Sequence, residues 1–205
     1  MNNNAYINHF CRINNGCLWL NGNLIYKADE TAGLNDFLKI LYSKFEMNYP
    51  KYFKMDSLCK LGFITAEILL KNAGSDINHV ETGIILSNSS SSLDTDLKYN
   101  DTINPDSYFP SPALFVYTLP NIVIGEIAIR HKITGECNFF VTEKPDSQLL
   151  YNYVIKMMDE NIIQRAVAGW VDVYKSEYNA ALFYIEKENI TNESIIFDPE
   201  FLNKK

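Results

Sequence analysis

Residues 119–145, LPNIVIGEIAIRHKITGECNFFVTEKP, contain the part of the sequence that decides the fold. The stretch begins with apolar residues at helical density and then reaches a tight turn at Thr134-Gly135. The apolar run from Cys137 to Thr142 is typical of a short buried strand, which stops at Glu143-Lys144-Pro145. Because proline favours the first turn of a helix, a second helix is expected to begin there.

The remaining segments alternate between strands and helices. Apolar, β-branched runs predict strands, helical spacing predicts helices, and polar residues 21–33 and 100–111 predict loops. The predicted strands are residues 5–13 with a continuation at 16–20, 80–86, 137–142, 163–174 and 179–186, and the predicted helices are residues 34–45, 55–73, 119–131 and 146–161.

This order, β-α-β-α-β-α-β-β, predicts an α/β protein with a mostly parallel five-stranded sheet and helices on both faces. The last two strands are joined by a short turn and must be antiparallel. The sequence shows no linker and no internal repeat. We therefore expect a single domain over residues 1–205, with a polar tail from about residue 188 that surrounds a short apolar patch at 195–197.

The helix predicted at residues 146–161 is unusually apolar. Within residues 149–158 only Asn152 and Lys156 are polar, and they lie one turn apart on a single stripe. A helix with so narrow a polar face is covered on most of its sides. We expect a partner, or the chain's own tail, to cover it, because an exposed apolar face of this size marks an interface.

Composition excludes several classes of function. The chain has 205 residues, of which 47% are apolar, and a formal charge of −7 with few clusters of lysine or arginine. Nucleic acid and anionic membranes both require basic surfaces, so neither is expected as a partner. The longest apolar run, residues 113–129, is interrupted by polar residues and is shorter than the roughly 20 residues of a membrane span. We therefore expect no membrane span, no secretory signal and a cytoplasmic location.

Few residues have the spacing of a metal or phosphate site. The cysteines form no C-x-x-C pair and are interpreted as buried thiols, so no metal or other cofactor is expected. A serine-rich run after the strand at 80–86 is either a phosphate cradle or, as its lack of glycine favours, a polar loop. Three aspartates fail the calcium-loop spacing and favour a solvated helix face. These residues are Cys11, Cys17, Cys59 and Cys137, the run Ser87–Ser92, and Asp94, Asp96 and Asp101.

Several short motifs resemble one protein family. They are Lys54-Met55-Asp56-Ser57-Leu58, Thr82-Gly83-Ile84-Ile85-Leu86-Ser87, Pro120-Asn121 with Gly125, Ile133-Thr134-Gly135 and Ala168-Gly169-Trp170-Val171-Asp172. In this order they resemble the N-terminal half of β-ketoacyl-acyl-carrier-protein synthases, which have the thiolase fold. The resemblance covers roughly residues 5–187, although no single motif is diagnostic.

The residues that depart from the family pattern concern catalysis. The resemblance places Lys144 where the synthases have their acyl-accepting cysteine, and lysine forms no thioester. His9, His79 and His131 match neither family histidine, because both belong to a C-terminal half that this sequence does not include. The resemblance therefore implies no catalytic residue and a degenerate nucleophile position. Two alternatives remain open: Lys144 as a catalytic amine, and Cys137 as a nucleophile with His131 as its base.

The resemblance implies a non-catalytic, chain-length-factor-like subunit that pairs with an intact ketosynthase or with itself and shapes an acyl tunnel. Such subunits belong to fatty-acid, polyketide and aryl-polyene pathways, with acyl carrier protein as a further candidate partner. The alternatives are a homo-oligomeric module that binds an acyl chain or carrier, and a small thiol- or lysine-dependent acyl-transfer enzyme. The strand at 137–142 and the apolar helix supply the predicted interface: Phe139, Phe140, Val141, Thr142, Leu149, Leu150, Tyr153, Val154 and Met157.

Overall fold

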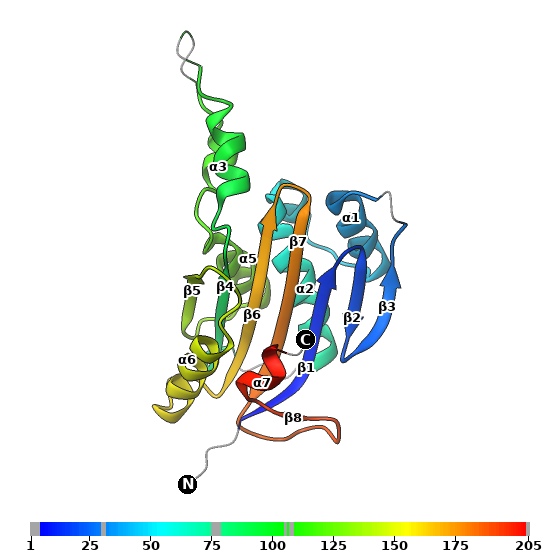
Figure 1. Cartoon of the computed structure of the whole chain (residues 1–205), viewed down its shortest axis with the longest axis vertical. Coiled ribbons are helices and arrows are strands. Elements are labelled where there is room, and N and C mark those ends of the chain that lie inside the picture. The colour runs from blue at the N-terminus through cyan, green and yellow to red at the C-terminus, as the bar shows by residue number, and fades with distance from the viewer. Residues whose placement is uncertain (1–4, 30–31, 75–78, 105, 107–108, 204–205) are drawn as a thin grey trace.

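All strands of the described chain belong to one twisted sheet (Figure 1). The structure is a computed structural model that describes residues 5–29, 32–74, 79–104, 106 and 109–203. The main strand order is β3-β2-β1-β7-β6-β4-β5, and β8 also pairs with β1. The strands are β1 (Tyr6–Asn14), β2 (Cys17–Leu20), β3 (Asn23–Lys27), β4 (Thr82–Asn88), β5 (Cys137–Val141), β6 (Arg165–Tyr174), β7 (Glu177–Glu186) and β8 (Ile195–Ile196).

The predicted five-stranded α/β sheet is confirmed as the centre of this larger sheet. β4 is parallel to both β5 and β6, whereas β7 is antiparallel to β6 and to β1. Four of the five central strands therefore run in one direction and β7 runs against them, as the short turn before β7 predicted.

Three short antiparallel strands, β2, β3 and β8, extend these five strands. β2 continues from β1 through a turn at Asn15-Gly16, as expected, where both residues have positive φ. β3 was predicted as a loop, and that prediction was wrong. Its residues are mostly exposed, so no alternating apolar pattern marks it, but Asn21 and Gly22 with positive φ form the preceding hairpin turn.

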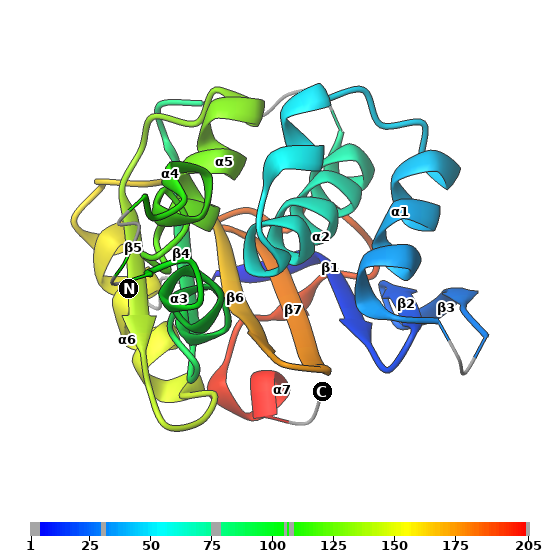
Figure 2. The same ribbon diagram turned by 90° about the horizontal axis from the view of Figure 1, so that it is seen from above.

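One face of the sheet is covered by α1 (Leu34–Lys44), α2 (Ser57–Ala73) and α5 (Ile122–His131) (Figure 2). The short 3-10 helix η1 (Pro50–Lys54) leads into α2. The Asp56 side chain caps α2 by accepting a hydrogen bond from the Cys59 N–H at 2.8 Å, and Gly74 with positive φ ends the helix.

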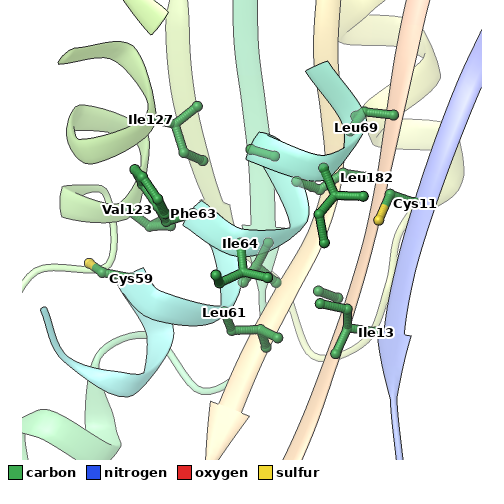
Figure 3. Packing of buried hydrophobic residues seen from close by; sticks show 14 of the residues in the cluster. Cys11, Ile13, Cys59, Leu61, Phe63, Ile64, Leu69, Val123, Ile127 and Leu182 are labelled. Carbon is green, nitrogen blue, oxygen red and sulfur yellow. The ribbon is translucent and has the colours of Figure 1, made fainter. Parts of the chain in front are cut away.

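Helix α2 forms the centre of the larger core (Figure 3). Its residues Leu61 and Ile64 are fully buried, and Phe63 lies with Val123 of α5 on the side away from β1. Gly62 permits this close approach, because a Cβ atom at that position would overlap the Val123 side chain. The helices predicted at residues 34–45 and 55–73 are therefore confirmed as α1 and α2.

The other face of the sheet is covered by α6 (Ser147–Asp159) and by the C-terminal segment, β8 and α7 (Pro199–Asn203) (Figure 2). Asn152 and Lys156 are exposed, as the polar stripe predicted, while Val154 is fully buried against the sheet. The tail packs beside α6: the Phe197 and Tyr151 rings lie 5.2 Å apart. We expected either a partner or the chain's own tail to cover α6, and the tail does pack against it.

Strand β5 lies at the edge of the sheet, paired with β4 alone among the described strands. The sequence predicted a buried strand, and that prediction was wrong: Cys137 and Val141 are exposed and the three residues between them are half-buried. Apolar composition does not distinguish a central strand from an edge strand whose side chains pack on helices of its own chain.

Residues between β4 and α5 form an arm that projects beyond the end of the sheet (Figure 1). It contains α3 (Leu93–Asn100) and α4 (Pro112–Phe115), joined by the predicted loop, of which residues 105, 107 and 108 lie outside the described residues. The arm carries large exposed apolar side chains: Leu93, Leu97, Ile103, Phe109, Phe115, Val116 and Leu119. No helix in the described part of the chain is long and apolar enough to cross a membrane.

Candidate functional site

The predicted nucleophile position lies in the loop between β5 and α6. Lys144 is exposed there, and its backbone carbonyl accepts a hydrogen bond from the Thr142 hydroxyl at 2.9 Å. The helix begins at Ser147 rather than at Pro145, because the Asp146 side chain accepts the Leu149 N–H at 2.9 Å and acts as the N-cap. Lys144 therefore lies in the loop before the helix cap, where it is exposed to solvent.

A hollow of about 90 Å³ lies beside the start of α6. Its walls are formed by residues of β4, β6 and β7, by the start of α6 and by Leu202 of α7, and none of its described lining residues is cysteine, histidine or lysine. It is lined by Ser87, Pro145, Asp146, Ser147, Leu150, Gly169, Trp170, Asn179, Ala181, Phe183 and Leu202. This lining offers no thiol or imidazole for covalent acyl transfer.

Gly169 allows β6 and β7 to meet closely at this hollow. Its φ of 155° lies in a region that disfavours other residues, and a Cβ atom there would overlap the Ala181 carbonyl oxygen. The Gly169 carbonyl also accepts a hydrogen bond from the Ser87 hydroxyl at 3.3 Å. Glycine within the predicted strand therefore marks a close backbone approach.

The serine-rich run after β4 is held by side chains of its own chain. Asp172 at the end of β6 accepts the Ser90 N–H at 3.0 Å and the Ser89 hydroxyl at 2.7 Å. The Ser91 N–H donates to Asn88 Oδ1 at 3.0 Å. Two amides that a phosphate cradle would use are thus already engaged, which favours the polar-loop interpretation. The sequence analysis gave Asp172 no role. Its position near the end of a predicted strand could have indicated that its carboxylate holds a neighbouring loop.

The aspartates of α3 make local contacts. Asp94 forms an ion pair with Lys98 at 2.6 Å, and Asp96 accepts the Ser92 hydroxyl at 3.1 Å. Within the described residues, no group of three or more histidine, cysteine, aspartate or glutamate side chains is placed to hold a metal ion. These contacts favour the solvated helix face over the calcium site.

The alternative pair, Cys137 and His131, does not form a catalytic dyad. Cys137 is exposed on β5, which corrects the expectation of a buried thiol, and partial burial raises the pKa of that thiol. Its Sγ lies 3.5 Å from the Gly135 carbonyl oxygen, whereas His131 Nε2 lies 3.0 Å from Glu67 Oε2. A thiol with a raised pKa and no imidazole contact is a poor nucleophile. The other three cysteines are buried, as expected.

The predicted interface residues fall into two groups. Phe139, Phe140, Val141 and Thr142 lie on or just after the open edge strand β5, together with Tyr153, whose hydroxyl accepts the Asn138 side-chain N–H at 2.9 Å. Leu149 is half-buried on α6. By contrast, Leu150, Val154 and Met157 are buried within the chain's own second core. These three side chains pack on the sheet, so they are not on the outer surface of α6.

Comparisons with solved structures identify the fold. The structure titled the ishigamide ketosynthase/chain length factor superposes with a TM-score of 0.69 at 14% identity, over 92% of this chain and 63% of that chain. A ketosynthase in complex with its chain length factor from Xenorhabdus doucetiae gives 0.56 at 11% identity, over 88% and 78% respectively. No protein-family sequence model matches the chain, and no curated protein matches it either.

These likenesses confirm the expected fold of the ketosynthase class. The structure of a type II polyketide acyl-carrier protein in complex with its ketosynthase also contains a similar chain. The TM-score is 0.61 at 11% identity, over 89% of this chain and 62% of that chain. The chain spans less than two thirds of the length of the ishigamide protein and of the ketosynthase bound to its acyl-carrier protein.

Proposed function

We propose that this chain is a non-catalytic ketosynthase-like subunit that pairs, through the open edge of β5, with an intact β-ketoacyl synthase. In the pair it contributes a wall of the acyl tunnel, as a chain-length factor in fatty-acid or polyketide-type biosynthesis of the aryl-polyene kind. Acyl carrier protein is the further partner of the pair. The observation that carries the proposal is an edge strand whose outer side is unpaired among the described residues, combined with a nucleophile loop that lacks cysteine and histidine.

The free edge of β5 is suited to pairing with another strand. Ile84 N–H donates to the Glu136 carbonyl and Thr142 N–H to the Asn88 carbonyl, both at 2.9 Å. In a parallel pair, residues alternate between bonding their neighbour strand and facing away from it. Residues 137, 139 and 141 therefore direct their backbone N–H and C=O groups away from β4. Unpaired groups in a row form a template for another strand, unless a protein protects the edge.

The α3–α4 arm supports the same proposal. Phe109 is 86% exposed, Phe115 60% and Leu119 59%, and the described contacts of α3 are chiefly with α4. Single exposed apolar residues are common, but a projecting arm rich in them is the kind of surface that a protein partner covers. An arm of this kind would extend into the partner and help to form a tunnel wall.

Native mass spectrometry of the chain co-expressed with the intact synthase of its gene neighbourhood tests the pairing. We expect a one-to-one heterodimer. Val141→Pro removes an outward N–H without removing a bond to β4 and is expected to weaken the pair at least tenfold. Val141→Thr keeps the N–H and the β-branched shape, so it serves as the matched control. Separation of the two unmodified proteins, or equal pairing by both variants, contradicts the proposal.

A homo-oligomeric acyl-binding module is the second candidate, because an open edge strand can pair with a second copy of itself across a two-fold axis. A homodimer of this chain that excludes the synthase would favour it. Incubation with an acyl thioester followed by intact-mass measurement separates both candidates from an enzyme. Both predict no covalent adduct, whereas an adduct on Lys144 or Cys137 would establish acyl transfer.

A further inference from the structure

A second hollow, of about 310 Å³, lies on the face covered by α6 and the tail, over β2, β1 and β7, and shares Asn179 with the first hollow. Arg12 of β1 lies opposite Trp19 of β2 and Ala181 of β7 in the sheet register, and directly opposite residues project from the same face. The lining consists of Phe10, Arg12, Asn14, Trp19, Gly22 and Asn179. It combines one cation, aromatic rings and amide groups.

Arg12 is the feature that requires explanation. Its Nε and Nη2 atoms are buried and have no hydrogen-bond partner among the described residues. No described carboxylate forms an ion pair with it, and its charged group lies 6.0 Å from the Phe183 ring centre. Burial lowers the pKa of Arg12 to about 10, so it remains a cation at neutral pH. Leaving a buried charged donor without an acceptor is unfavourable, because the group loses its hydrogen bonds to water and gains none in the protein.

The other two arginines of the chain show what this edge of a guanidinium group normally binds. Arg130 donates from Nε to Glu67 Oε2 at 3.0 Å and from Nη2 to Glu67 Oε1 at 2.6 Å. Arg165 donates from Nε to Glu186 Oε1 at 2.8 Å. Nε and Nη2 form the edge that holds a carboxylate with two parallel hydrogen bonds. Arg12 has the same edge and no such acceptor.

We propose that the hollow at Arg12 binds the carboxylate of a small organic acid that has a flat, aromatic or conjugated body. The hollow has the volume of a small-molecule site, and its lining places two aromatic rings beside one guanidinium group and two amides. The acid's body lies against Trp19, and its carboxylate pairs with Arg12. Protein atoms cover Nε and Nη2 in the unliganded chain, so binding of the carboxylate requires the guanidinium group to turn toward the hollow. This site lies away from the β5 edge and does not depend on the proposed pairing.

Titration of the ¹⁵N-labelled chain with benzoate, observed by NMR at the Arg12 Nε–H and the Trp19 indole N–H, tests the proposal. We expect saturable shifts of both signals with a Kd on the order of 1 mM. Benzamide, the neutral analogue, should bind at least tenfold more weakly, and so should inorganic phosphate at matched ionic strength. Absence of saturation at roughly ten times that concentration overturns the proposal, as does equal binding of benzamide or of phosphate.

Two variants connect binding to the guanidinium group. Arg12→Met keeps an unbranched apolar side chain and should bind benzoate at least tenfold more weakly. Lys39→Met removes the same charge from an exposed position of α1 and should bind as the wild type does. Arg12→Met should also melt no lower than the wild type, because it removes a buried charge that has no partner. A much lower melting temperature, or unchanged benzoate binding in Arg12→Met, would contradict the proposal.

Discussion

The two faces of the sheet are covered in different ways. On one face α1, α2 and α5 enclose a continuous core in which Leu61, Ile64 and Val171 are fully buried. On the other, α6 and a short C-terminal segment form a smaller core beside two hollows. The first face is therefore covered by three helices that share one continuous core, whereas the second is covered by one long helix and a short tail beside the open edge of β5. A truncated side chain should cost more stability on the first face than on the second.

Ile64→Ala should produce the largest effect, because α2 lies at the centre of the complete core. We expect a loss of about 2–5 kcal/mol in the free energy of unfolding, measured by chemical denaturation. Leu202→Ala in α7 is the matched change on the other face and should lose less than about 1 kcal/mol, since Leu202 is only half-buried. Equal losses from the two variants would contradict the contrast between the faces.

Glu67→Gln tests the ion pair that joins α2 and α5. Burial alone would raise the pKa of Glu67, but hydrogen bonds from His131 and Arg130 lower it to about 2. A lowered pKa in the folded chain stabilises it above the unfolded value of about 4.5, and this stabilisation is lost as pH falls toward 2.

The expected loss in Glu67→Gln at neutral pH is about 3 kcal/mol, measured by urea denaturation. The difference from the wild type should shrink between about pH 4.5 and pH 2. A difference that does not change with pH across this window would show that the stabilisation is not due to the charge of Glu67.

Phe201→Ala tests how the tail holds the second face. The Phe201 ring lies 5.7 Å from the Phe10 ring and 6.4 Å from the Phe183 ring, but α7 is short and can move to fill the space. We expect a loss of only about 1 kcal/mol, together with faster amide exchange confined to β8 and α7. Global unfolding by this variant would show that the tail is an integral part of the core.

Cysteine alkylation should produce the smallest energetic effect. Cys137 is exposed, whereas Cys11 and Cys59 are almost completely buried. Intact-mass measurement after brief treatment of the folded chain with a maleimide should show one adduct, on Cys137, forming faster as pH rises because its thiol pKa is raised. The adduct should change stability by less than about 0.5 kcal/mol. Modification of Cys11 or Cys59 before Cys137 would contradict the structure.

The central sheet could be predicted from the sequence because its elements carry strong periodic signals. The α2 segment has a capping aspartate, a continuous apolar face and a terminal glycine, and all three signals agree. β3 and the exposed position of β5 could not be predicted, since strand pairing depends on neighbours distant in the sequence. The resemblance correctly indicated the fold, because motif order reflects the order of the elements.

The candidate site was only partly predictable. The resemblance, aligned on Gly135 and Thr142, located the loop that contains Lys144, but the exposure of Lys144 depends on the cap formed by Asp146, which starts the helix after Pro145. The hollow at Arg12 joins three strands from opposite ends of the sequence, so no local pattern could reveal it. A single arginine in a strand does not indicate a binding site. Only the structure shows that Arg12 has no hydrogen-bond acceptor for Nε and Nη2 among the described residues.

The most direct test of the central claim is amide hydrogen exchange in β5, with and without the intact synthase. The account predicts that residues 137, 139 and 141, whose amides face the open edge, exchange at least tenfold more slowly in the complex. Residues 138 and 140, already bonded to β4, should change less. A complex that leaves β5 exchange unchanged would contradict pairing through this edge.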